Sequence, residues 1–205
     1  MKTALSLMAL VLAVSGCVNF GQNANTPAVV YYVLDDAGSA TAAPAPAEAR
    51  ERSYVPTLLV LDTTAGGFYD TDQLVFSRTA GTRGQYQFAR WTERPGKRFA
   101  ELLRARLDRL GDYRVVSSGG AVRGDLMLDT RLVEFYHDAT REPGQVRLVL
   151  RAELVDLKQR RLLGRHTFEQ TVPLTTYDAA GAARASSQAV GRVLDDLGAW
   201  LARLE

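Results

Sequence analysis

The sequence predicts an α/β protein of the α+β kind. A mostly antiparallel sheet of about six to seven strands packs against two helices in a two-layer sandwich. Two segments place apolar residues at helical spacing between residues that favour helix ends. Other segments alternate apolar and polar residues, which is typical of strands with one buried face. The last three of these strands follow one another across short turns, so we expect them to pair as antiparallel hairpins.

The N-terminal half contains four predicted strands, because β-branched and aromatic residues dominate four short segments. Gly81 and Gly84 join the last two of them. Ala65, Gly66 and Gly67 mark a turn after the second. The four segments are residues 28–34, 57–61, 73–78 and 86–91.

A helix is predicted between Pro95 and Gly111. Proline suits the first turn because its missing N–H needs no partner there, and glycine suits the position just past a helix end. The residues at helical spacing form one face that should pack on the sheet, with Arg106 as its single polar member. That face consists of Phe99, Leu102, Leu103, Arg106, Leu107 and Leu110.

The C-terminal half predicts three strands and a long helix. The strands cover residues 126–136, 146–154 and 162–172, separated by turns at Pro143-Gly144 and at residues 158–160. The helix covers residues 179–204 and is expected to be capped by Asp178. Its apolar stripe consists of Val190, Val193, Leu194, Leu197, Trp200, Leu201 and Leu204.

The N-terminus has the pattern of a bacterial lipoprotein signal. Lys2 supplies a positive charge, residues 4–14 are almost wholly apolar, and Val14-Ser15-Gly16-Cys17 follows them. A signal that ends in this way is cut before Cys17, whose thiol carries a diacylglyceryl group. The apolar stretch is shorter than the roughly 20 residues that span a bilayer. We therefore expect a lipid anchor rather than a spanning helix.

This interpretation divides the chain into three parts. Residues 1–16 are the signal peptide, residues 17–26 a lipidated tether, and residues 27–205 a single globular periplasmic domain. The domain contains an Ala/Pro-rich surface loop over residues 36–53. Extended, the tether spans at most about 30 Å, so the domain should stay near its membrane.

Composition limits the classes of function. Without its first 16 residues the chain keeps 189 of 205, enough for one domain with a sizeable core. The formal net charge of +2 gives no argument for a nucleic-acid partner. Cys17 is the only cysteine, and its lipidation leaves no thiol for a disulfide, a metal cluster or a nucleophile. We expect no cofactor and no metal, and the covalent lipid on Cys17 as the one attached group.

No catalytic constellation is evident, so the protein is predicted not to be an enzyme. The nucleophile elbow, the phosphate loop and the dinucleotide motif are all absent. His137 is expected at a strand end in a polar turn. His166 shares the register of Phe168 and Val172, which favours a hydrogen-bonded core residue over a metal ligand.

Two motifs carry a resemblance to a known family. The first is Phe68-Tyr69-Asp70-Thr71-Asp72-Gln73-Leu74-Val75-Phe76-Ser77-Arg78, and the second is Ala89-Arg90-Trp91-Thr92-Glu93 ahead of a Leu-rich helix. They follow the lipidation motif and the Tyr31-Tyr32-Val33-Leu34 strand in order. Together they resemble the ABC-type transport auxiliary lipoprotein family, which includes paraquat-inducible lipoprotein C. The Ala/Pro-rich loop and Gly66-Gly67 depart from the family pattern.

The resemblance implies a partner and a membrane. Such lipoproteins accompany an MCE-domain substrate-binding subunit and an ABC permease complex, which move lipids or other apolar compounds across the periplasm. The expected role is to dock this assembly to a membrane. Retention at the inner membrane is usually signalled by Asp after the lipidated cysteine. Val18 stands there, which favours the periplasmic face of the outer membrane over the inner membrane.

Five residues of the two motifs are candidates for the partner interface. They are Phe68, Tyr69, Arg78, Arg90 and Trp91, since Trp and Arg are over-represented at interface hot spots. The competing interpretation is that the aromatic residues pack in the core and the arginine side chains pair locally.

Other functions stay open from the residues alone. One is a structural lipoprotein that assists outer-membrane assembly. Another is a lipid-binding periplasmic lipoprotein, with an apolar ligand held between the helices and the sheet. An envelope hydrolase is the weakest alternative, because no nucleophile and base pair is evident.

Overall fold

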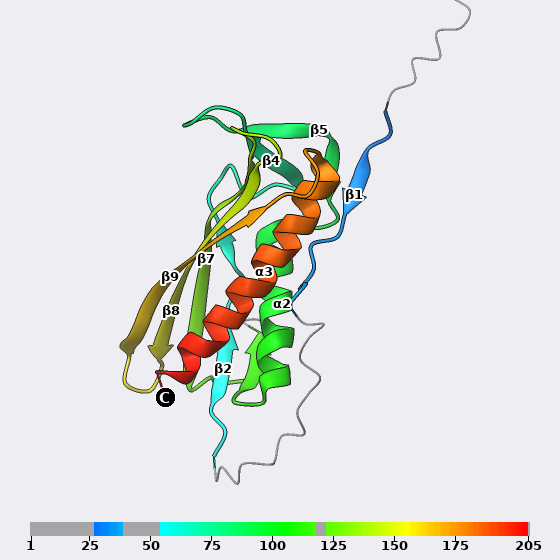
Figure 1. The fold of residues 1–205 in the computed structure, drawn as a ribbon. Coiled ribbons are helices and arrows are strands. Elements are labelled where there is room, and N and C mark those ends of the chain that lie inside the picture. Colours follow the sequence, from blue (N-terminus) through cyan, green and yellow to red (C-terminus); the bar gives the residue numbers. More distant parts are fainter. Residues whose placement is uncertain (1–26, 39–53, 118–121, 205) are drawn as a thin grey trace, which may run out of the picture.

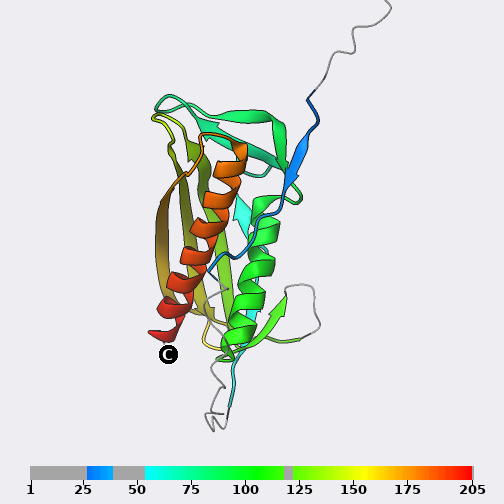
Figure 2. The same ribbon diagram turned by 45° about the vertical axis from the view of Figure 1, so that its right-hand side comes forward.

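The computed structural model describes residues 27–38, 54–117 and 122–204. The predicted signal peptide, the tether with Cys17, and residues 39–53 of the predicted loop lie outside these ranges. In the described part, two helices lie on one face of a large sheet (Figures 1 and 2). The elements in chain order are β1 Val30–Tyr32, β2 Thr57–Val60, β3 Thr64–Ala65, β4 Gln73–Ser77, β5 Gly84–Trp91, α2 Pro95–Leu110, β6 Arg114–Ser117, β7 Leu126–Asp138, β8 Gln145–Asp156, β9 Arg161–Pro173 and α3 Ala179–Ala202.

The prediction of six to seven mostly antiparallel strands is wrong in number and in direction. The described residues form one nine-stranded sheet of mixed pairing. The β1–β5, β2–β6, β2–β7, β3–β7 and β4–β7 pairs are parallel, whereas β4–β5, β7–β8 and β8–β9 are antiparallel. The two unpredicted strands, β3 and β6, are two and four residues long, too short for an alternating pattern to stand out.

Strand β7 organises the sheet. On one side it pairs with β8 along nearly its whole length. On the other side three short strands follow one another along it, with β2 at residues 126–128, β3 at residues 131–132 and β4 at residues 137–138. Segments far apart in sequence therefore meet along one strand, and β5 and β1 extend the sheet beyond β4.

A bulge in β7 reverses which side chains face the helices. The register against β8 shifts between Leu132 and Glu134. Before the shift Leu128 and Leu132 are buried, and after it Phe135 and His137 are buried. An extra residue inverts the alternation beyond it. His137, expected in a polar turn, is therefore only 2% exposed.

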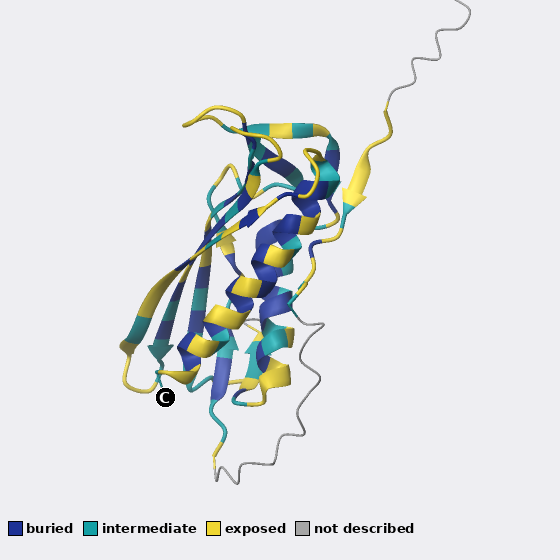
Figure 3. Ribbon diagram, in the orientation of Figure 1, coloured by how far each residue is buried: buried dark blue, intermediate teal, exposed yellow. Residues whose placement is uncertain are grey.

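The ends of both helices match the sequence prediction. Pro95 is at the first turn of α2, and Gly111 ends the helix in the left-handed conformation with φ 74°. The Asp178 side chain accepts a hydrogen bond of 2.6 Å from the backbone N–H of Gly181 and caps α3. The apolar stripe of α3 faces the sheet (Figure 3). Leu110, by contrast, was expected on the packed face of α2 and is half exposed.

His166 also differs from its prediction. It is exposed at the edge of the helix-facing side of β9, where its ring stacks on Trp200 with a centroid distance of 6.2 Å. Phe168 contacts the same two rings. The prediction that His166 and Phe168 lie on the same face of β9 was correct. Because β9 is an edge strand, the His166 ring lies over the border of the core and is not enclosed by it.

Candidate partner interface

Strand β1 presents apolar side chains to solvent at an edge of the sheet. Val29, Val30, Tyr31 and Val33 are between 41% and 60% exposed, and β1 pairs on one side only, with β5 (Figure 3). We call these four residues the β1 edge. An unpaired strand edge offers backbone N–H and C=O groups to another chain. Exposed apolar side chains that lie close together also mark interaction sites on soluble proteins.

The residues after β1 hold this edge in place. Leu34 is buried, and its carbonyl accepts a hydrogen bond of 3.0 Å from Arg98 Nε on α2. The N–H of Asp35 donates to Ser187 Oγ of α3 at 3.2 Å. Gly38 then passes so close to Gly191 that a Cβ on Gly191 would lie 2.4 Å from the Gly38 nitrogen. Residues 34–38, which we call the crossing segment, are thus fixed to both helices.

The structure brings the two family-like motifs together. Arg90 Nη1 lies 3.2 Å from Asp72 Oδ1, and Arg94 Nη1 lies 3.3 Å from Asp70. Tyr31 of the β1 edge is the register partner of Arg90. The aspartates of the first motif therefore hold arginines at and just after the second, directly beside the β1 edge.

Trp91 is placed as a core residue. Its side chain is 3% exposed and stacks on Phe135 with a centroid distance of 5.9 Å. A partner would have no access to this indole in the observed fold. The placement matches the competing interpretation, that the aromatic residue of this motif packs inside.

Tyr69 is also engaged within the protein, whereas Phe68 is not covered. Arg83 Nε donates a hydrogen bond of 2.9 Å to Tyr69 Oη, and the Arg83 guanidinium lies 3.7 Å from the centroid of the Tyr136 ring. Glu134 approaches the same guanidinium at 3.7 Å. Phe68 is 45% exposed beside Tyr69. Phe68 therefore remains available for contact, and Arg83 is a neighbour that the sequence did not single out.

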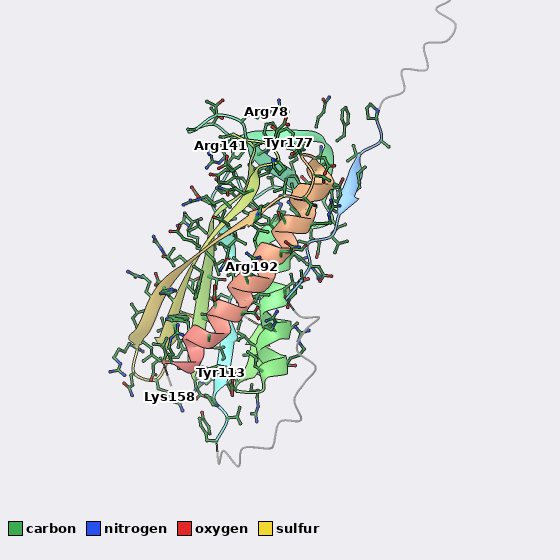
Figure 4. All side chains as sticks on the ribbon, viewed as in Figure 1. Arg78, Tyr113, Arg141, Lys158, Tyr177 and Arg192 are labelled. Atoms are coloured by element: carbon green, nitrogen blue, oxygen red, sulfur yellow. The ribbon has the colours of Figure 1, made fainter. Side chains whose placement is uncertain are left out.

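Arg78 lies near the C-terminal end of β7, on the face of the sheet opposite to that of Tyr69. Its guanidinium is 4.9 Å from the centroid of Phe76, which contacts Tyr86 edge to face. Tyr86 in turn stacks on His137. Figure 4 shows Arg78, Arg141 and Tyr177 at this same end of the molecule. Tyr136 and His137 are neighbours in β7, so their rings point to opposite faces of the sheet. Tyr69 lies on the Tyr136 side, through Arg83, and Arg78 lies on the His137 side, through Phe76 and Tyr86.

His137 is buried in a polar pair with Tyr86. The hydroxyl of Tyr86 lies 2.8 Å from His137 Nδ1, and His137 Nε2 lies 3.3 Å from the carbonyl oxygen of Pro143. Burial lowers the pKa of His137 below its ordinary value. Burial also raises the pKa of Tyr86 to about 12. Both groups are therefore neutral near pH 7, which fits a structural role.

The five predicted interface residues do not form one surface. Phe68 and Arg78 are exposed on different faces, Tyr69 and Arg90 are partly covered, and Trp91 is buried. The β1 edge gathers four exposed apolar residues in one short segment, and none of them is among the five predicted residues. Its only signal was the β-branched run at residues 28–34, which indicates a strand but not which of its edges stays unpaired.

Two absences concern the part of the chain that the structure describes. Within the ranges 27–38, 54–117 and 122–204, no three His, Cys, Asp or Glu side chains gather as a metal site would require. Neither described helix combines the length and the hydropathy needed to cross a bilayer. Cys17, the predicted lipidation site, lies outside the described residues.

Comparison with known proteins gives a family and a fold. A family model described as "ABC-type transport auxiliary lipoprotein component" matches residues 32–198. The crystal structure of protein XCC0632 from Xanthomonas campestris, described as family DUF330, has 22% identity and a TM-score of 0.72, covering 85% of this chain and 96% of its own. An uncharacterized protein has 12% identity and a TM-score of 0.65, covering 85% and 99%. At these identities the two structures show a shared fold.

A more distant match is lipoprotein GNA1162 from Neisseria meningitidis. It has 12% identity and a TM-score of 0.39, and the match covers 72% of this chain and 99% of that one. A similarity at this level carries no argument about function. No curated protein matches the chain.

Proposed function

The chain belongs to the ABC-type transport auxiliary lipoprotein component family, whose model covers residues 32–198 of its 205, and from this membership we propose a docking role. In this proposal the protein ties an MCE-type ABC transport system to a membrane and binds its MCE-domain substrate-binding subunit. The transported compounds are lipids or other apolar molecules that cross the periplasm. The protein itself is a non-enzymatic component, and its only non-protein group is the lipid on Cys17.

The observation that carries this proposal is the β1 edge. Its apolar side chains are exposed, although burying them would be favourable by roughly 25 cal/mol for each Å² of apolar surface. The crossing segment fixes the strand to both helices, so a partner meets a preformed surface and little ordering entropy is lost on binding. Phe68 supplies a second exposed aromatic side chain.

The anchor places this surface near a membrane. The predicted tether ends at residue 26, and the β1 edge begins three residues later at Val29. A tether of this length holds the edge within a few tens of Å of the lipid attached to Cys17. Membership in a lipoprotein family fits a membrane-anchored periplasmic protein. We propose the outer membrane, because Val18 rather than Asp follows Cys17.

The test is an affinity pull-down of the lipidated protein from detergent-solubilised envelopes, with partners identified by mass. We expect an MCE-type subunit to be recovered with the wild-type chain and lost with Tyr31→Ser/Val33→Ser. The matched control is Val133→Ser, which changes an exposed apolar residue on β7 outside the β1 edge.

Three outcomes would contradict the proposal. Recovery of outer-membrane assembly components in place of an MCE subunit would favour the structural lipoprotein. Recovery of no partner would remove the docking role. Equal recovery with the β1-edge variant would show that docking uses another surface.

A further inference from the structure

A cavity of about 400 Å³ lies between the sheet and the C-terminal end of α3. Its walls come from the starts of β7 and β9, the end of β8 and the segments flanking β2 and β6. The main lining residues are Tyr54, Tyr113, Leu126, Leu154, Leu163 and Leu204. Figure 4 shows Tyr113 and Lys158 at this end of the molecule, beside the C-terminus and away from β1.

The lining consists of four leucines, one proline and two tyrosines. No charged side chain lies among the residues that line the cavity, and leucines from three neighbouring strands face it. Leaving such walls in contact with water is unfavourable, whereas an apolar ligand removes them from water. Ligand pockets typically have volumes of about 300–1,000 Å³, so this one suits a single chain rather than a bulky molecule.

The cavity opens beside a group of polar residues that fixes its rim. The Asp125 carboxylate accepts hydrogen bonds from the hydroxyl of Tyr54, from the Thr57 N–H at 2.8 Å and from Lys158 Nζ at 2.8 Å. Lys158 Nζ also lies 5.5 Å from the centroid of the Tyr54 ring. These bonds lower the pKa of Asp125, so it stays ionised and already paired.

One cation, Lys158, lies at this opening, 5.5 Å from the ring of the lining residue Tyr54. Lys158 is 69% exposed, and Arg161 and Arg203 are exposed residues near the lining residues Leu163 and Leu204 in sequence. The Asp125 charge is shared among the three donors just described. An anionic head group would therefore meet positive charge at the rim, while its hydrocarbon chain would meet leucines inside.

We propose that this cavity binds one acyl chain that carries an anionic head group. Free fatty acids and single-chain phospholipids share this chemistry. The site is distinct from the β1 edge and does not depend on the docking role, so we expect Tyr31→Ser/Val33→Ser to leave acyl-chain binding unchanged.

The experiment uses the mature chain, residues 17–205, with Cys17→Ser so that it carries no acyl group of its own. Binding is measured as the fluorescence increase of cis-parinaric acid, a fluorescent fatty acid. We expect saturable binding that Leu163→Trp weakens by about tenfold or more, because the indole excludes methylenes from the cavity. Leu162→Trp is the matched control, since the neighbouring Leu162 is 46% exposed, and it should bind as the wild type does.

Two additional variants keep the test decisive. Leu204→Trp fills the cavity from a position beyond the end of α3, so it serves if Leu163→Trp does not fold. Lys158→Gln should weaken binding about two- to fivefold at low salt, in the range measured for exposed ion pairs. The weakening should disappear in high salt, where exposed charges are screened.

Competition and extraction identify the source of the ligand. Displacement by oleate but not by lysophosphatidylglycerol would assign a fatty acid, and the reverse would assign a single-chain phospholipid. Mass spectrometry of lipids extracted from the purified chain should recover the same class. Absence of saturable binding would overturn the proposal. Equal binding by Leu163→Trp and Leu162→Trp would do so as well.

Discussion

Asp36 and Arg106 form an ion pair in which both side chains are largely covered, across a separation of 70 residues. Arg106 Nη2 donates to Asp36 Oδ1 at 2.6 Å, and Arg106 Nε donates to Asp36 Oδ2 at 3.0 Å. Arg106 also pairs with Asp195 of α3. One arginine thus connects the crossing segment, α2 and α3, and it explains the polar residue on the apolar face of α2.

Arg106→Ala should destabilise the fold strongly. It would leave the Asp36 carboxylate, 6% exposed, without its main partner, and such changes typically cost about 3–5 kcal/mol. The control is Arg109→Ala, because Arg109 reaches the same carboxylate at 3.3 Å but is 55% exposed and should contribute under about 1 kcal/mol. Urea unfolding followed by tryptophan fluorescence measures both. Equal losses in the two variants would show that the Asp36–Arg106 pair has no special role.

Trp91→Ala should lower stability by about 3–5 kcal/mol, as large-to-small changes of aromatic core residues do. The indole is buried against Phe135, so its removal leaves a cavity. Phe68→Ala, at an exposed position of the neighbouring motif, should change stability by less than about 0.5 kcal/mol. Thermal melts would compare them. A folded, fully stable Trp91→Ala protein that fails to bind its partner would return Trp91 to the interface.

Gly191→Ala should loosen the crossing segment. The added methyl group would lie 2.4 Å from the Gly38 nitrogen, so the backbone has to move, and overpacking of this kind costs about 1–3 kcal/mol. Gly198→Ala is the control in the same helix, because its methyl group would meet only the end of the half-exposed Leu110 side chain. That variant should gain about 0.5–1 kcal/mol from helix propensity. Proteolysis near residue 38 should accelerate only in Gly191→Ala.

Acid should weaken the fold through His137. Its pKa is depressed by burial, so the unfolded chain takes up a proton first as the pH falls below about 6.5, the ordinary value. Stability is therefore fully present above that pH and is lost below it, by at most about 1.4 kcal/mol per pH unit for one proton. Asp138 and Asp178 lie near enough to offset part of this loss. Urea unfolding at pH 7.5 and 5.5 should show a smaller difference in His137→Gln.

The opposite result for His137 would also be informative. A steeper loss in His137→Gln than in the wild-type chain would mean that protonated His137 is retained in the fold. The pair with Tyr86 would then stabilise the cation. The paired carboxylates add their own losses only at lower pH, because their pKa values are depressed in the fold.

Membrane placement should follow residues 17 and 18. Cys17→Ser is expected to release the protein into the periplasm, because the covalent lipid is the proposed anchor. Val18→Asp should move the lipidated protein from the outer to the inner membrane fraction. Density-gradient separation of the two membranes measures both. A wild-type chain already in the inner membrane fraction would reverse the proposed location, and membrane retention of Cys17→Ser without a bound partner would remove the anchor.

Local chemistry explains why much of the fold could be predicted. Pro95, Gly111 and Asp178 mark helix ends through backbone preferences that act within a few residues. The alternation at residues 146–154 indicates a strand with one buried face, as observed in β8. These signals depend only on neighbours in sequence. They can therefore be recognised without knowing how the rest of the chain folds.

Pairing between distant segments could not be predicted in this way. Whether β2, β3 and β4 approach β7 in the parallel or the antiparallel sense depends on connections that leave no periodic pattern. The bulge at Val133 shifts one register by one residue and turns His137 inward. Both are properties of the assembled sheet, because strand direction and register are decided by the partner strand.

The candidate sites divide in the same way. By itself the sequence determined the lipidation motif at Cys17, the two ordered motifs and their family resemblance, since each is a local string of residues. Only the tertiary structure decided that Trp91 is buried, that the β1 edge is exposed and that a cavity opens beside Lys158. The physical reason is that exposure depends on which surfaces meet in space. Trp91 gives the same signal in the sequence whether its side chain faces a partner or packs against Phe135.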